Sequence, residues 1–280
     1  MTDADIYPVE SDRRRFVKGV VGASSLAALG ATGAAAVSLS TTPTGVGGGI
    51  TQFMGIDLVG GPAPRGMPQI PVEVDDEGYL VGIWPEVQEV EVEGQTVQIA
   101  EMELGGITYS ASWYNYCGGQ TKEGTHPTAD QENYIHYATA MYDWQAETVS
   151  TGDRVHIDHF DDYEEWDNNI GTPGIGKPGR CRWRSEDVGP ADVLPVQVIR
   201  SSIIEEAAED DEWLAASTDE GFLAIANMCT HFCCVPSFKG TRESEQFGTG
   251  DEIYCQCHQS VYDPFNIYQQ QFVALPRQDI

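Results

Sequence analysis

The 280-residue chain predicts a mainly β fold built from antiparallel sheets. Short runs of alternating or β-branched residues are separated by turn residues, which is typical of strands in such sheets. These runs cover residues 71–74, 79–84, 87–92, 96–100, 193–199 and 222–226. Only residues 203–215 in this part of the chain predict a helix. The length allows one or two domains, and residues 70–280 are enough for a buried core.

The N-terminal part predicts an export signal. Arg13, Arg14 and Arg15 precede Phe-Val-Lys and a stretch without charged residues, which is typical of a twin-arginine signal. We expect residues 1–18 on the cytoplasmic side and residues 19–40 as a signal or transmembrane helix, since these 22 residues approach the length that spans a bilayer. Small residues at 34–36 also fit a cleavage site, so cleavage and retention both remain open at this point.

The rest of the chain divides into a linker and a head domain. Residues 41–69 are dense in Gly and Pro and predict a flexible linker, which would let a head domain move. We assign residues 70–280 to the head domain. Within it, residues 111–190 predict an insertion of unassigned chemistry, and residues 226–265 contain most of the cysteines.

The charge is strongly acidic. Asp and Glu number 44 against 15 Lys and Arg, a formal net charge of −29. Repulsion from phosphates therefore excludes nucleic acid as a partner. The acidic residues are spread along the whole chain. This distribution favours a surface adapted to very high salt, as in a halophilic archaeon, over an acidic docking face for a basic redox partner.

Two short segments combine cysteine with histidine. Cys229 is followed by His231, and Cys255 by His258. Two thiolates and two imidazoles suit a [2Fe–2S] cluster in which histidines replace cysteines on one iron, which raises its reduction potential. The same residue types can also form a tetrahedral zinc site, which is the weaker alternative because structural zinc has no need for the further cysteines nearby.

The two segments, C-T-H-F-C-C from Cys229 and C-Q-C-H-Q-S-V-Y from Cys255, resemble the cluster-binding boxes of Rieske iron–sulfur proteins of cytochrome bc and b6f complexes. The family boxes read C-T-H-L-G-C and C-P-C-H-G-S. Cys233 and Gln259 stand where the family has glycine, and Gln256 stands where it has proline. The loop between the boxes, residues 238–252, is also longer than is usual. Whether both backbones follow the family's turns is therefore left to the structure.

The resemblance implies four ligands to a [2Fe–2S] cluster: Cys229, His231, Cys255 and His258. It also implies a disulfide between Cys234 and Cys257. Ser260 would donate a hydrogen bond to a bridging sulfide and Tyr262 to a ligand sulfur, which stabilises the reduced cluster and favours the high-potential branch of the family. The implied fold is a pair of stacked antiparallel sheets with a small cluster-binding subdomain.

The function implied by the resemblance is electron transfer in a membrane complex that oxidises quinol. His258 would accept a hydrogen bond from quinol, and the electron would pass to a cytochrome c or a blue-copper protein. A cytochrome b-type subunit would take the second electron. The head domain would then lie on the extracytoplasmic face of the cell membrane, with the N-terminal segment retained as an anchor in the lipid bilayer, and an oxidising compartment would allow the disulfide. The alternative is a small Rieske subunit that relays electrons in an exported molybdenum oxidoreductase.

Three cysteines and a histidine pair fall outside this scheme. Cys117 and Cys181 flank the insertion, and a disulfide between them could staple it. We expect Cys233 to be a small buried residue. His156 and His159 lie among acidic residues, and the pattern favours an exposed strand over a second metal site.

Overall fold

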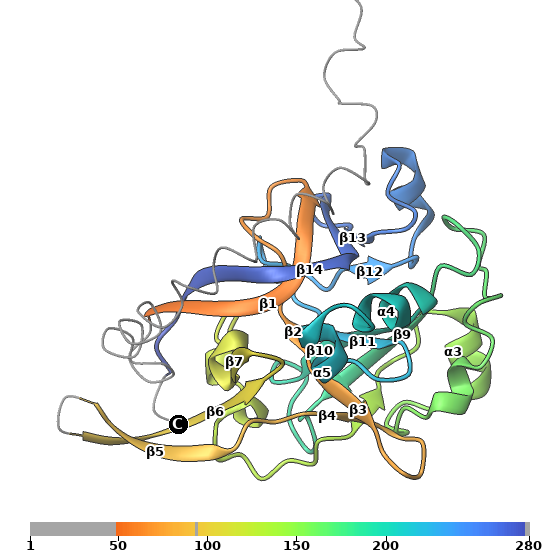
Figure 1. The fold of residues 1–280 in the computed structure, drawn as a ribbon. Helices are drawn as coiled ribbons and strands as arrows, with labels where there is room; N and C mark the ends of the chain where they lie inside the picture. Colours follow the sequence, from red (N-terminus) through yellow and green to blue (C-terminus); the bar gives the residue numbers. More distant parts are fainter. Residues whose placement is uncertain (1–48, 93–94, 278–280) are drawn as a thin grey trace, which may run out of the picture. The chain divides into compact units, whose positions relative to one another are not determined.

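The computed structural model describes residues 49–92 and 95–277, and it is mainly β, with 38% strand and 17% helix. The strands are β1 Gly49–Gly60, β2 Gln69–Ile70, β3 Val72–Val74, β4 Leu80–Gly82, β5 Val87–Val92, β6 Gln95–Leu104, β7 Ile107–Ser110, β8 Ile135–Tyr137, β9 Lys177–Trp183, β10 Leu194–Arg200, β11 Phe222–Ala226, β12 Ser237–Phe238, β13 Ile253–Cys255 and β14 Ser260–Ala274 (Figure 1). All six predicted strands are confirmed within a few residues.

Short helices connect the strands. The α-helices are α3 Asp143–Thr148, α4 Ser202–Ala208 and α5 Glu212–Ser217, and the 3-10 helices are η1 Ala111–Tyr114, η2 Gly119–Thr121, η3 Glu123–Thr125, η4 Ile157–Phe160 and η5 Arg242–Phe247. The single helix predicted for residues 203–215 is therefore two helices. The break has a local cause, because the Asp211 carboxylate accepts a hydrogen bond from the backbone N–H of Leu214 at 2.9 Å and starts a new helix as its N-cap.

Two larger antiparallel sheets organise the chain. One has the strand order β1-β14-β13-β12 and the other β2-β11-β10-β9-β8, while β3-β4 and β5-β6-β7 form smaller sheets. All five residues of β11 are buried, which identifies it as a central strand. The residues that follow β11 and those that join β13 to β14 contain the two cysteine–histidine segments, so one segment leaves each of the larger sheets.

Residues 111–190 are part of the core rather than an added insertion. Strand β9 pairs with β10 along its whole length, and β8 extends the same sheet. The completely buried Trp113 and Trp183 pack in the main hydrophobic core. The segment expected to be an insertion therefore supplies strands to one of the larger sheets, and the sheet that supports β11 would be incomplete without them.

The folded domain also begins earlier than predicted. Residues 49–60, assigned to the flexible linker, form β1, which pairs with β14, and Phe53 and Ile56 are completely buried. Glycines within and just after this strand allow neighbouring backbone segments to pack closely. A Cβ added at Gly66 would lie 1.7 Å from the carbonyl oxygen of Ile56, so a side chain cannot be accommodated there. Composition alone cannot distinguish a glycine of this kind from a glycine in a linker.

The predictions for residues 1–18, 19–40 and 41–48 lie outside the described residues. Among the residues that the structure describes, no helix has the length and apolar character needed to cross a membrane.

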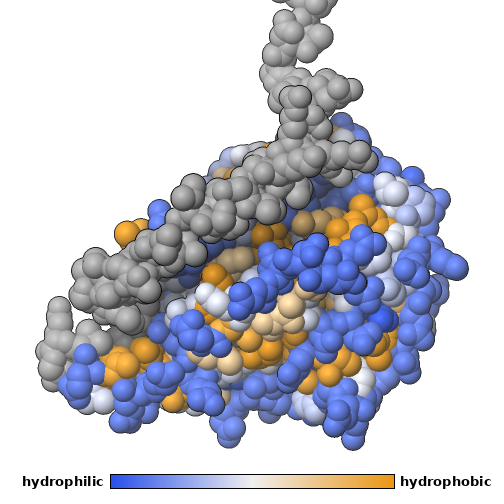
Figure 2. Space-filling model, in the orientation of Figure 1, coloured by the Kyte–Doolittle hydropathy of each residue, from blue (hydrophilic) through white to orange (hydrophobic). Residues whose placement is uncertain are grey.

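The lysines that the structure describes are buried in the fold. The three lysines in the described part of the chain are buried, and each donates a hydrogen bond to a backbone carbonyl: Lys122 to Ala191 at 2.6 Å, Lys177 to His159 at 2.7 Å and Lys239 to Thr172. Hydrophilic residues cover much of the visible surface in Figure 2, interrupted by a band of hydrophobic ones. With its lysines withdrawn from solvent, the surface is dominated by carboxylates.

Candidate metal centre

The two cysteine–histidine segments are tight loops. Loop 1, residues 229–234, follows β11, and loop 2, residues 255–260, joins β13 to β14 as a hairpin. In loop 1 the Cys229 N–H donates to the Cys234 carbonyl at 2.7 Å, and the Cys233 N–H donates to the Cys229 carbonyl at 2.8 Å. In loop 2 the Gln259 N–H donates to the Cys255 carbonyl at 2.8 Å. These backbone bonds close each loop around its histidine.

Both loops contain a left-handed residue at the position where the Rieske boxes have glycine. The φ angle is 60° at Cys233 and 63° at Gln259. The left-handed conformation costs a non-glycine residue about 1–2 kcal/mol, so other contacts hold these turns. Both residues thus take up the backbone conformation that favours glycine.

The sulfurs of Cys229 and Cys255, one from each loop, lie close together. Cys229 and Cys255 are buried free thiols, and the Tyr262 hydroxyl donates to the Cys229 sulfur at 3.1 Å. The pKa of Cys229 is lowered, first by a hydrogen bond from the Cys255 thiol and further by the Tyr262 hydroxyl and the His231 N–H, although burial opposes this. The pKa of Cys255 is raised, because it supplies that hydrogen bond and is itself buried. The pocket therefore favours a thiolate at Cys229, the form that binds metal.

The two histidines of the loops face each other. The ring centroids of His231 and His258 are 4.7 Å apart, and the planes are almost perpendicular. The Phe232 ring lies against both imidazoles, with centroids 4.4 Å from His231 and 5.1 Å from His258. His258 is exposed and Phe232 is 66% exposed, so this edge of the site meets solvent. The structure thus brings the four predicted ligands to one place, with two buried sulfurs, a half-buried imidazole at His231 and an exposed imidazole at His258.

Two polar atoms at this site are buried without a hydrogen-bond partner among the described residues: His231 Nδ1 and Ser260 Oγ. The Ser260 hydroxyl lies beside the Cys229 sulfur and contributes to its lowered pKa, but the geometry falls short of a hydrogen bond. A buried polar atom without a partner is costly. A ligating imidazole nitrogen and a hydroxyl that donates to a sulfide are the roles that a [2Fe–2S] cluster would give these atoms, so the residues fit the group.

The disulfides differ in part from the prediction. Cys234 and Cys257 are bonded, as the resemblance implies, and this bond joins loop 1 to loop 2. Cys117 is bonded to Cys233, with Cα atoms 5.3 Å apart, while Cys181 is a buried free thiol in β9. The predicted Cys117–Cys181 staple is therefore wrong. Cys233 is exposed, so the expectation of a small buried residue is also wrong.

Sequence analysis missed the contribution of residues outside the two loops. The Arg65 guanidinium lies over the Phe272 ring at 4.5 Å and the Tyr116 ring at 5.5 Å, and the Arg65 carbonyl accepts a hydrogen bond from the Thr230 hydroxyl at 2.6 Å. The Tyr116 hydroxyl donates to the carbonyl of Ala226, the last residue of β11, at 3.1 Å. The aromatic run before Cys117 was the only available signal.

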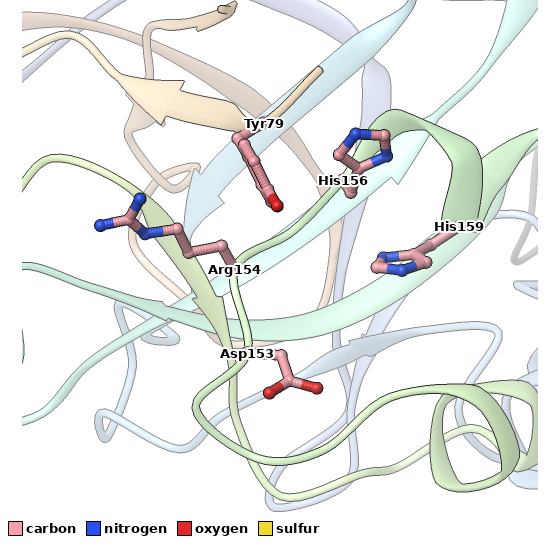
Figure 3. Close-up of a pocket in the computed structure, with 5 residues that line it drawn as sticks. All are labelled: Tyr79, Asp153, Arg154, His156 and His159. Atoms are coloured by element: carbon pink, nitrogen blue, oxygen red, sulfur yellow. The ribbon is translucent and has the colours of Figure 1, made fainter. Parts of the chain in front are cut away.

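A second histidine group lines a shallow pocket of about 420 Å³ with Tyr79, Asp153 and Arg154 (Figure 3). His156 immediately precedes the 3-10 helix η4, and His159 lies within it. The prediction of an exposed strand at this position is therefore wrong. The His156 Nδ1 accepts from the Asp158 N–H at 3.2 Å, and its Nε2 lies 2.9 Å from the Glu77 carbonyl. Protein groups thus occupy both nitrogens of His156.

Two further groups of ligand-type atoms occur within residues 49–92 and 95–277. The sulfurs of Cys234, Cys255 and Cys257 lie within 4.8 Å of one another, which reflects the approach of the two loops. Glu132, His136 and Glu186 also gather within that distance. There, one Glu132 oxygen is 2.7 Å from His136 Nε2 and the other is 2.5 Å from the Arg154 guanidinium. Protein groups, including the Arg154 guanidinium, therefore already occupy both oxygens of Glu132.

Comparison with known proteins adds no relative: no family model, no curated protein and no solved structure matches the chain.

Proposed function

We propose that this chain is a Rieske-type electron-transfer protein that binds a [2Fe–2S] cluster between loops 1 and 2. Cys229 and Cys255 would bind one iron, and His231 and His258 the other. When bound, such a cluster supplies one-electron transfer at a potential between roughly −150 and +300 mV. The observation that carries the proposal is the buried, unpartnered Nδ1 of His231 beside two buried free thiols.

The surrounding residues suit a high-potential centre. The Tyr262 hydroxyl already donates to the Cys229 sulfur, and the Ser260 hydroxyl is free to donate beside it. Hydrogen bonds to the sulfurs favour the more negative, reduced state. Both hydroxyls are at the offsets expected from the resemblance. Structural zinc makes no use of them, so the donor set favours the iron–sulfur cluster over zinc.

The exposed edge supports exchange of electrons and protons with a partner. His258 is exposed on loop 2, where its outer nitrogen could accept a hydrogen bond from quinol. We propose quinol oxidation in a complex with a cytochrome b-type membrane subunit, with a cytochrome c or blue-copper protein as acceptor. The second candidate is the relay subunit of an exported molybdenum oxidoreductase, because an exposed imidazole also suits electron relay without quinol. Two disulfides favour an extracytoplasmic location for either one.

The cluster is tested by the metal content and spectrum of the purified protein. We expect about two irons and two sulfides per chain and an electron paramagnetic resonance signal after reduction with dithionite. Cys255→Ala should remove both, whereas the matched control Cys181→Ala, at a buried free thiol in β9, should retain both. A colourless protein that contains zinc, or an unchanged signal in Cys255→Ala, would refute the assignment.

The complex is tested separately by gentle solubilisation of native membranes and identification of the subunits that purify with the chain. A haem b subunit together with quinol-dependent reduction of the cluster is the expected result. Purification with a molybdenum subunit would favour the second candidate. Recovery of the chain alone in the soluble fraction would contradict both assemblies while leaving the cluster assignment intact.

A further inference from the structure

We infer that the Cys117–Cys233 disulfide is a positioning brace that holds loop 1, and with it Cys229 and His231, in the ligand-binding conformation. This inference rests on the proposed function. The brace is separate from the Cys234–Cys257 bond between the two loops, and it connects loop 1 to a segment 116 residues earlier in the chain.

The segment that supplies Cys117 is firmly anchored. Cys117 follows helix η1, and Trp113, Tyr114 and Tyr116 before it are buried in the main core. The Tyr116 hydroxyl is bonded to the end of β11, the strand from which loop 1 departs. The Cys117 sulfur itself lies 3.5 Å from the Cys229 carbonyl oxygen, so the brace touches the backbone of a ligand residue.

The residue at the other end of the brace needs support. Cys233 has a φ of 60°, a conformation that cysteine disfavours and that persists only where the surroundings fix it. The Cys233 N–H donates to the Cys229 carbonyl, and the left-handed turn at Cys233 brings the next carbonyl, that of Cys234, back to accept from the Cys229 N–H, so that both bonds close loop 1 around His231. A change in the Cys233 backbone would therefore open the turn that presents both ligands.

Loop 2 shows why loop 1 requires a covalent support. Gln259 has the same left-handed conformation and forms no disulfide of its own, but it is enclosed by the β13–β14 hairpin, in which Cys255 pairs with Ser260. Loop 1 has no strand partner of this kind, since it runs from β11 in one sheet to β12 in the other. Two adjacent cysteines of loop 1 form separate disulfides, Cys233 with Cys117 in the core segment and Cys234 with Cys257 in loop 2.

The test compares two double variants that carry no new free thiol, Cys117→Ala with Cys233→Ser and Cys117→Ala with Cys233→Gly. Serine disfavours the left-handed conformation and glycine adopts it readily. We expect the serine variant to lose iron to a chelator roughly tenfold faster than wild type and to show a shifted paramagnetic resonance spectrum. The glycine variant should recover the wild-type spectrum. Cys181→Ala serves as the control for loss of a buried sulfur.

Two results would overturn the inference. One is wild-type iron retention and spectrum in the serine variant. The other is a peptide map of the non-reduced wild-type protein, with or without cluster, in which Cys117 is free or paired with Cys181. Absence of a cluster from wild type would instead refute the proposed function, and the peptide map would still report on the disulfide.

Discussion

The chain gathers imidazoles in two places, and only one of them contains a buried ring nitrogen without a partner among the described residues. Backbone groups lie at both ring nitrogens of His156, and the Tyr137 oxygen lies 3.0 Å from His159 Nδ1. At His231 and His258, a buried Nδ1 has no partner among the described residues. Proximity of histidines is therefore a weaker sign of metal binding than a buried nitrogen that the protein has left unpaired.

The largest difference should appear when one histidine of each group is replaced by alanine. His231→Ala removes a proposed ligand and should abolish the cluster, lowering iron from about two per chain to near zero. His159→Ala removes an imidazole already bonded to Tyr137 and should leave iron unchanged. Iron and sulfide analysis of the two purified variants measures this. Equal iron loss in both variants would erase the distinction between the two groups.

A smaller effect is expected from the hydroxyls around the proposed cluster site. Tyr262→Phe removes the hydrogen bond to the Cys229 sulfur. If this bond is stronger in the reduced state than in the oxidised state by roughly 1.5 kcal/mol, the upper end of a typical net hydrogen-bond contribution, its loss lowers the reduction potential by roughly 60 mV for one electron. Ser260→Ala should change the potential in the same direction.

Redox titration followed by paramagnetic resonance measures both changes. Tyr137→Phe, which removes a hydroxyl from the other histidine group, is the matched control and should leave the potential unaltered. A lower potential in Tyr137→Phe, or an unchanged potential in Tyr262→Phe, would contradict the proposed arrangement.

The smallest effect concerns the stability supplied by the second histidine group. Burial lowers the pKa of His159 below 6.5, and the neighbouring His156 and Lys177 lower it further, while Asp158 and Asp153 oppose the change. The folded protein thus binds a proton less readily than the unfolded chain. This contribution is fully present above pH 6.5 and is lost as the pH falls below that value.

His159→Gln should reduce the free energy of unfolding by roughly 1 kcal/mol at neutral pH through the lost bond to Tyr137. The variant should also show a shallower fall in stability below pH 6.5, because the titrating group is gone. Urea denaturation above and below this pH measures both quantities. An unchanged pH dependence would show that other groups control acid stability.

The sequence was sufficient where local chemistry decides the structure. The apolar run in residues 222–226 predicts β11 to the residue, and the two boxes identify the residues that meet at the candidate site. The partner of Cys117 could not be predicted, because it depends on how the aromatic run 113–116 packs against the end of β11. Similarly, the glycines near Gly66 suggest a linker until the backbone of β1 is seen against them.

The pairing of β1 with β14 forms a ribbon that ends beside loop 2. Gly49 pairs with Ala274 at one end, and Gly60 pairs with Val261 at the other, one residue from loop 2. Its 12 residues in β1 correspond to roughly 40 Å of strand. The ladder between the two strands is interrupted at Ile56–Asp57 and again at Leu58–Gly60. Because such irregularities bend a strand, the part of the ribbon beside loop 2 can differ in direction from the part that begins at Gly49.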